Sequence, residues 1–136
     1  MLLIVLLILF GAGVYFYKEY NRKPANISNV APDASVSASA LVEVYESDEA
    51  KANQQYLGKT IQVTGAIAEI NNQQDTLVTV LIGESNSMHK VSCLLDSRNI
   101  ALVRNYRVGQ QIIIRGVCTG YLMDVEMNRC VIIEKK

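Results

Sequence analysis

QQIIIRGVCTGYLMDVEMNRCVII, residues 110–133, is the stretch that decides the fold. Apolar residues dominate both halves, and a short segment with a glycine and a tyrosine separates them. This pattern predicts two strands joined by a tight turn, over residues 110–121 and 124–133. We expect this hairpin to be the last part of a small β-sheet that closes on itself.

An earlier segment has the same pattern as the first half of this hairpin. Residues 58–67 (GKTIQVTGAI) and 109–118 (GQQIIIRGVC) both begin with a glycine and both contain a second glycine in mid-strand. Glycines inside strands are typical of bulges and sharp bends, which a sheet needs in order to close. The alignment places Cys118 in register with Ile67 on the buried face, which favours a core role for this thiol.

The remaining elements follow from the spacing of apolar residues. Three- and four-residue spacing predicts a helix over residues 37–56, with Ser37 or Ser39 as its N-cap and Gly58 after its end. A polar loop is expected over residues 71–75. Alternation of apolar and polar residues predicts strands over 61–70, 76–82 and 89–96. The loss of this alternation after residue 96 predicts a short helix within 97–106.

Five strands with a helix between the third and the fourth is the order of an OB-fold, a small Greek-key barrel. The predicted fold class is therefore mainly β: a five-stranded OB-fold barrel with an N-terminal helix and a short helix between strands 3 and 4. Another small five-stranded barrel or an open α+β sheet is the alternative. The domain is expected to occupy residues 37–136.

The N-terminus has a different composition. Residues 2–17 (LLIVLLILFGAGVYFY) contain no charge and end in aromatic residues, so residues 1–20 are predicted to be a transmembrane helix with the lipid bilayer as partner. A cleaved signal peptide is the alternative, but neither a basic n-region nor a small-residue cleavage site is present. Residues 21–36 contain both prolines without periodicity, which predicts a flexible linker.

The side of the membrane stays open. Lys18, Arg22 and Lys23 follow the apolar segment, and the positive-inside rule taken literally leaves the domain in the cytoplasm. A start site a few residues upstream would place further charge before the segment and reverse that orientation. The predicted localisation is a membrane with a single-pass N-terminal anchor and an unresolved side for the domain.

Charge and motifs exclude several classes of function. Thirteen basic and thirteen acidic residues give a formal net charge of zero, without the basic excess typical of nucleic-acid-binding domains. Residues 61–96 contain only Lys90 as a basic residue other than His89, and no aromatic residue, whereas single-strand binders use cations and stacking aromatics. Metal-binding and catalytic motifs are absent as well. We predict a non-catalytic protein without metal or cofactor, and we disfavour nucleic acid as its partner.

The three cysteines, Cys93, Cys118 and Cys130, leave at least one thiol free in a monomer. Free cysteine is among the most buried residue types, so the main interpretation is that these are small core residues. A disulfide between Cys118 and Cys130 is the alternative, and it requires that the domain be exported.

Two motifs resemble a known family. A-N-x-x-Y-x-G-K occupies residues 52–59, and G-x-C-x-G-x-x-x-D-V-x-x-x-x-C occupies residues 116–130. Together with the flanking strands, over residues 41–133, they resemble the tRNA_anti-like family of small bacterial proteins, many from Bacteroidetes. The N-terminal segment followed by YNRKP is also similar, although basic residues before it are lacking. The resemblance implies an OB-fold domain and carries no established activity.

The candidate ligand site follows from the expected fold. We expect the loops after the first and fourth strands to adjoin, which would bring Asn71, Asn72 and Gln73 near Tyr121 and Asp124. A structural role for Asp124, capping turn amides, is the competing interpretation. The sequence thus predicts an anchored OB-fold module for a peptide, glycan or protein partner. Single-stranded nucleic-acid binding and a scaffolding role in the membrane are the alternatives.

Overall fold

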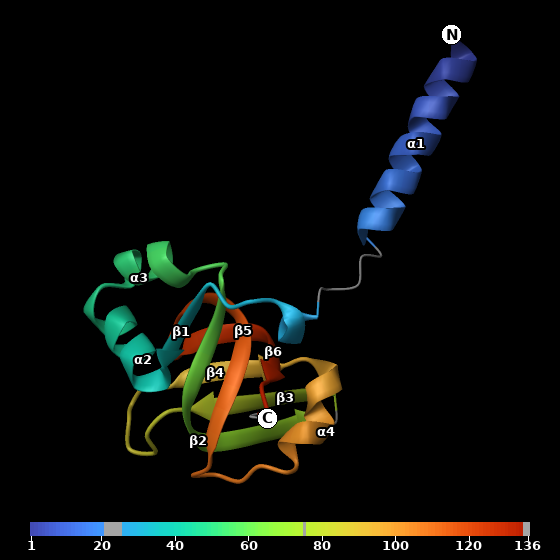
Figure 1. Cartoon of the computed structure of the whole chain (residues 1–136). Helices are drawn as coiled ribbons and strands as arrows, with labels where there is room; N and C mark the ends of the chain where they lie inside the picture. Colours follow the sequence, from blue (N-terminus) through green and yellow to red (C-terminus); the bar gives the residue numbers. More distant parts are fainter. Residues whose placement is uncertain (21–25, 75, 135–136) are drawn as a thin grey trace.

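The computed structural model describes residues 1–20, 26–74 and 76–134 (Figure 1). An N-terminal helix precedes a β-barrel that carries short helices around it. In chain order the elements are α1 (Leu2–Tyr20), η1 (Ile27–Asn29), β1 (Ala34–Ser37), α2 (Ala38–Ser47), α3 (Glu49–Tyr56), β2 (Thr60–Gln74), β3 (Leu77–Ile82), β4 (Val91–Leu95), η2 (Ser97–Asn99), α4 (Ile100–Val103), β5 (Gln111–Tyr121) and β6 (Val125–Ile132).

Strands β2 to β6 form a closed barrel (Figure 1). The strand order is β1-β2-β3-β4-β6-β5, and an additional pairing of β2 with β5 closes the sheet. The β4–β6 pair is parallel, whereas the β2–β3, β3–β4, β5–β6 and β2–β5 pairs are antiparallel. The prediction of a mainly β, five-stranded closed barrel with helices is confirmed.

Closure depends on strand β2, which pairs with two different neighbours. Its first half, from Thr60 to Ala66, pairs with β5, and its second half, from Ile67, pairs with β3. Gly65 lies at this change of partner, where an added Cβ would come within 2.6 Å of the Ile82 side chain. The mid-strand glycine therefore permits the close approach of strands that closure requires.

Two predicted boundaries are wrong for local reasons. Residues 71–74, expected to be part of a loop, belong to strand β2. They pair with β3 through backbone hydrogen bonds, which do not depend on apolar side chains. The expected single helix over 37–56 is two helices. Asp48 has an extended backbone between them, and its Oδ1 accepts a hydrogen bond of 3.0 Å from the Lys51 amide, which starts a second helix. Ser37 is the N-cap of the first helix, as predicted.

The predicted flexible linker is wrong for residues 26–36; residues 21–25 lie outside the described residues. Ile27 in η1 is buried, and β1 pairs in parallel with the start of β2. The Arg115 guanidinium of β5 donates hydrogen bonds to the carbonyl oxygens of Ser28 (3.1 Å) and Val30 (2.6 Å). Local composition could not reveal this order, because the partners come from distant strands.

The expected transmembrane helix corresponds to α1. Across the residues that the structure describes, no helix combines the length and the apolar character of a membrane span. The anchor therefore stays a prediction.

The core interpretation of the cysteines is confirmed. Cys93, Cys118 and Cys130 are free and buried. The alternative Cys118–Cys130 disulfide is not formed, because the register of the last hairpin pairs Cys118 with Met127. Cys130 lies instead against Gly116, where an added Cβ would come within 2.6 Å of its sulfur atom.

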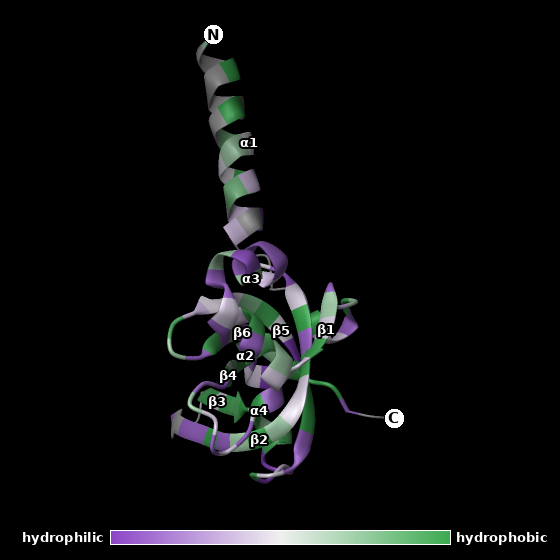
Figure 2. Ribbon diagram, turned by 90° about the vertical axis from the view of Figure 1, so that its left-hand side faces the viewer, coloured by the Kyte–Doolittle hydropathy of each residue, from purple (hydrophilic) through white to green (hydrophobic). Residues whose placement is uncertain are grey.

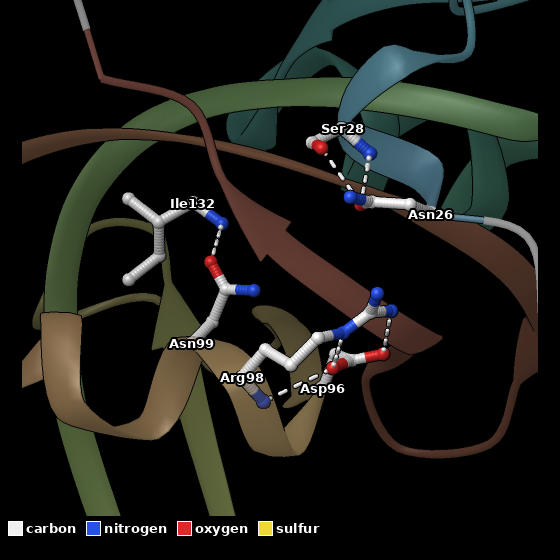
Figure 3. A network of polar contacts seen from close by, with 6 residues as sticks. All are labelled: Asn26, Ser28, Asp96, Arg98, Asn99 and Ile132. Atoms are coloured by element: carbon white, nitrogen blue, oxygen red, sulfur yellow. Dashed lines mark hydrogen bonds and ion pairs between the residues drawn. The ribbon is translucent and has the colours of Figure 1, made fainter.

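The short helical segment after β4 is held by the polar contacts in Figure 3. The Asp96 carboxylate accepts hydrogen bonds from the Arg98 amide (3.1 Å) and from its guanidinium (2.8 Å). The buried Asn99 accepts a hydrogen bond of 3.0 Å from the Ile132 amide through its Oδ1 atom. These contacts start η2 and fasten it to β6.

Asp96→Asn is expected to change the acid sensitivity of the fold. Hydrogen bonds from Arg98 lower the pKa of Asp96 to about 2, below the value of about 3.9 in an unfolded chain. The carboxylate therefore stabilises the fold above roughly pH 4, and this contribution is lost as the pH falls towards 2. In urea unfolding, the variant should be less stable than wild type at pH 6, and the two should converge in acid. A difference independent of pH would contradict this, and Arg98→Gln should behave like Asp96→Asn.

Candidate binding groove

A groove of about 670 Å³ lies between helix α3 and the β5–β6 hairpin. This volume is within the range of small-ligand sites. We name it the α3 groove. Its lining residues come from α3 and the residue after it (Glu49, Asn53, Leu57), from the end of β5 and the turn (Thr119, Gly120, Tyr121, Leu122) and from β6 (Glu126, Asn128).

Helical spacing explains which side chains α3 presents to the groove. Glu49, Asn53 and Leu57 are four residues apart and so lie on one face. Ala52 and Tyr56 lie on another face and are buried in the core. Figure 2 colours much of the α3 ribbon as hydrophilic, in line with the charged and amide residues of this helix.

Backbone hydrogen bonds fix the end of α3 against β5. Gly58 has a φ of 76°, a left-handed conformation that ends the helix. Its amide donates to the Cys118 carbonyl at 2.8 Å, and the Cys118 amide donates to the Lys59 carbonyl at 3.0 Å. The position of Leu57 relative to the hairpin is therefore set by main-chain contacts.

The tip of the β5–β6 hairpin is apolar and exposed. Leu122 and Met123 are 84% and 78% exposed, and Leu57 across the groove is 48% exposed. The hairpin turns over residues 122–124, where the Leu122 amide donates to the Asp124 carbonyl at 3.2 Å. Gly120, with a φ of 133°, lies just before the turn at a register shift in β5. Apolar side chains gathered at one exposed place mark an interaction surface more often than isolated ones do.

Tyr121 connects the groove to helix α2. Its ring stacks on the buried Tyr45, with centroids 5.5 Å apart, and contacts the His89 ring edge-on at 5.9 Å. Burial raises the pKa of the Tyr121 phenol above its usual value, and the carboxylates of Glu46, Asp124 and Glu49 raise it further. The phenol is thus a neutral, fixed wall of the groove at physiological pH.

The charged side chains of the groove are carboxylates. Glu49 and Glu126 supply carboxylates, and none of the described residues that line the groove is lysine or arginine. Burial raises the pKa of Glu126, and a hydrogen bond with Ser92 opposes that shift. The Oδ1 atom of Asn53 is buried and has no hydrogen-bond partner within the described part of the chain.

Only part of the predicted site lies at this groove. Tyr121 lines it directly. Asp124 follows in the turn, and its Oδ1 atom accepts a hydrogen bond of 2.7 Å from the Lys90 amide. This contact is the structural role that competed with ligand binding in the interpretation of Asp124.

The expectation that the two loops adjoin is wrong. Strand β2 starts beside the end of β5, with Thr60 opposite Val117, and then runs away from it for 15 residues. Asn71 lines a separate pocket of about 330 Å³ at the β2–β3 hairpin. Asn72 is exposed on the same strand, and the Gln73 side chain lies outside the described residues. The polar run and Tyr121 are thus at opposite ends of β2.

Sequence reasoning missed Leu57, Asn53 and Glu49 as groove residues, because only the packing of α3 on the hairpin brings them there. One local signal was available. Leu122 and Met123 form an apolar pair at the tip of a turn, where polar residues are the rule. An apolar turn tip in a closed barrel indicates a surface that contacts something else.

The closed five-stranded barrel with its helices defines an OB-fold domain. The tRNA_anti-like family model matches residues 1–132, so the chain belongs to the tRNA_anti-like family. The resemblance inferred from the two motifs is confirmed.

Solved structures with a similar fold come from several organisms. A Klebsiella pneumoniae subsp. pneumoniae MGH 78578 protein named "putative nucleic acid-binding lipoprotein" matches with a TM-score of 0.61 at 17% identity, over 82% of this chain and 100% of its own. Asparaginyl-tRNA synthetase of Entamoeba histolytica matches at 0.45 and 16% identity, over 58% of this chain and 21% of its own.

The replication Factor A Related Protein of Methanobacterium thermoautotrophicum matches at 0.42 and 18% identity, over 57% of this chain and 84% of its own. Comparison with curated proteins gave no match. At these identities, the Klebsiella structure supports the fold alone.

Proposed function

We propose that the chain is a membrane-anchored, non-catalytic OB-fold module that binds its ligand in the α3 groove. One observation carries the proposal: the exposed side chains of Leu57 and Leu122 line the same groove as the carboxylates of Glu49 and Glu126. Apolar contact surface with a few convergent polar groups is the usual composition of a ligand site. The ligand then covers the leucines and places its polar groups against these carboxylates.

Helix α1 supports the anchoring part of this proposal. Ile4, Ile8 and Phe10 are exposed on it. The family model extends over this helix, and the similar Klebsiella protein is named a lipoprotein.

Single-stranded nucleic acid is the second candidate ligand. The name of the similar Klebsiella protein, a nucleic acid-binding lipoprotein, favours it. The surface of this chain disfavours it, because β2, β3 and β4 contain no lysine, arginine or aromatic residue. Two arginines elsewhere are engaged within the fold, Arg98 with Asp96 and Arg115 with Val30.

The experiment uses the full chain reconstituted in neutral phosphatidylcholine liposomes. Flotation with the liposomes, abolished by replacing Phe10 and Ile8 with aspartate, tests the anchor. Binding of a fluorescent leucine–glutamine peptide, an oligothymidylate and a chito-oligosaccharide then tests the module. Leu57→Ser combined with Leu122→Ser should weaken the binding of the true ligand class about tenfold or more, because two leucines lose apolar burial of about 1 kcal/mol each.

Leu77→Ser is the matched control, since Leu77 is 50% exposed and lies at the separate β2–β3 pocket. It should leave binding unchanged. If Leu77→Ser alone weakens binding, or if no probe responds to the groove substitutions, the α3 groove is not the ligand site.

A further inference from the structure

We infer that the α3 groove binds a cationic, apolar segment of a partner protein, with lysine or arginine side chains against Glu49 and Glu126 and leucine-sized side chains against Leu57 and Leu122. This inference rests on the proposed function and names the ligand class of the same groove. It follows from the carboxylates of the groove, which set both its charge and its hydrogen-bonding needs, and from its exposed leucines.

The charges of the groove have one sign. Glu49 lies on α3 and Glu126 on β6, so carboxylates come from both walls. Glu46 and Asp124 add negative charge near Tyr121. The Lys90 amide donates to the Asp124 carboxylate. The charged Nζ atom of Lys90 donates instead to the Ser87 carbonyl at 2.6 Å, so this cation is already engaged. An anionic occupant would be repelled from the groove, whereas a cationic one is attracted to it.

The hydrogen-bonding groups of the groove require a donor. Glu49 and Glu126 are acceptors when ionised. Lysine and arginine side chains carry only donors, so they complement both carboxylates. Phosphate groups carry only acceptors in their ionised form and cannot form a hydrogen bond with either carboxylate. This chemistry separates a cationic peptide from a nucleic-acid backbone.

The apolar rim identifies a protein segment rather than a small cation. Leu57 and Leu122 line the groove and are exposed, and the exposed Met123 follows Leu122 in the turn. A polyamine would satisfy the carboxylates but leave these side chains in water. Apolar anchors surrounded by charges that set orientation are typical of peptide-binding surfaces, and the flexible thioether of methionine adapts to different partners. A lipid surface is disfavoured because the carboxylates oppose anionic headgroups.

The test measures peptide binding to the full chain in nanodiscs of neutral lipid, with empty nanodiscs as the blank. Three short peptides share the same leucines and differ only in carrying lysine, glutamine or glutamate at the other positions. The lysine peptide should bind at least about tenfold more tightly than the glutamate peptide at low salt, and the preference should shrink towards about 0.15 M salt.

Two sets of variants locate the effect. Glu49→Gln with Glu126→Gln should lower the affinity for the lysine peptide to that for the glutamine peptide. Glu69→Gln, an exposed carboxylate of β2 away from the groove lining, should leave the affinity unchanged.

Each of the remaining outcomes would reject a stated part of the inference. Equal binding of all three peptides, lost in the Leu57→Ser and Leu122→Ser variant, leaves the groove as a binding site but rejects the cationic segment. Failure of every peptide to bind rejects the cationic segment. If the leucine substitutions also leave the binding of the glycan and of the oligothymidylate unchanged, the proposed function fails too. Full displacement of the lysine peptide by spermidine at similar affinity rejects a protein segment. Groove-dependent binding of phosphatidylglycerol vesicles assigns the surface to lipid instead.

Discussion

Gly116→Ala is expected to lower the free energy of unfolding by about 1–3 kcal/mol, as overpacking of a filled core does. A Cβ at this position would lie 2.6 Å from the Cys130 sulfur, 3.1 Å from the Asn128 carbonyl oxygen and 3.3 Å from the Cys130 Cα. Two of these three atoms belong to the backbone of β6, so a side-chain rotation cannot relieve the whole overlap. The β5–β6 hairpin must open slightly, and this hairpin supplies two walls of the groove.

Urea unfolding of the full chain in mild detergent measures the effect. Cys130→Ala added to Gly116→Ala removes the closest of the three contacts, so the double variant should be less destabilised than the sum of the two single variants. Gly109→Ala is the control. Gly109 has a φ of 90° and no neighbouring atom within 4 Å of an added Cβ, so it should cost about 1 kcal/mol of backbone strain and show no coupling to Cys130. Additive effects of Gly116 and Cys130 would contradict this account of the overlap.

Tyr45→Ala is expected to have a still larger effect, a loss of about 3–5 kcal/mol in the free energy of unfolding. Tyr45 is fully buried and joins helix α2 to the barrel. Its ring lies 5.5 Å from that of Tyr121 and 6.4 Å from that of Tyr56, and its hydroxyl contacts the Cys118 sulfur at 3.2 Å. Alanine leaves a cavity among these groups and removes the support of Tyr121 in the groove wall.

Tyr45→Phe separates the ring from its hydroxyl. It keeps the packing and loses only the contact with Cys118, so it should cost about 1 kcal/mol or less. Thermal or urea unfolding of wild type and both variants makes the comparison. Similar losses for phenylalanine and alanine would mean that the hydroxyl contact, and not ring packing, holds α2 to the barrel.

The strands were predictable because their signal is local. Alternation of apolar and polar residues in the segment after Gly58 and in the one after Gly109 required one buried face, and β2 and β5 have that face. The paired glycines indicated bending, and both Gly65 and Gly116 lie at close approaches between strands. Ser37 was recognisable as an N-cap, whereas the break at Asp48 was missed although aspartate is an equally good cap.

The site was only partly predictable. Tyr121 was identified from its place at the end of a predicted strand, beside Asp124 at the turn, and it lines the groove. Asn71 and Asn72 were grouped with it on an assumption about loop positions, and the register of β2 against β5 places them at the other end of the strand. Leu57 and Glu49 carry no sequence signal for a groove, because a helix end acquires that role only where another element faces it.

The sequence by itself determined the closed mainly β barrel, the buried thiols and the family, because each depends on periodicity or on short motifs within one segment. Tertiary structure alone decided that residues 26–36 join the barrel and that α3 and the last hairpin enclose a groove. Both outcomes depend on pairs far apart in the chain, Arg115 with Val30 and Gly58 with Cys118. Such pairs form only after closure of the sheet has brought their strands together, so no local pattern records them.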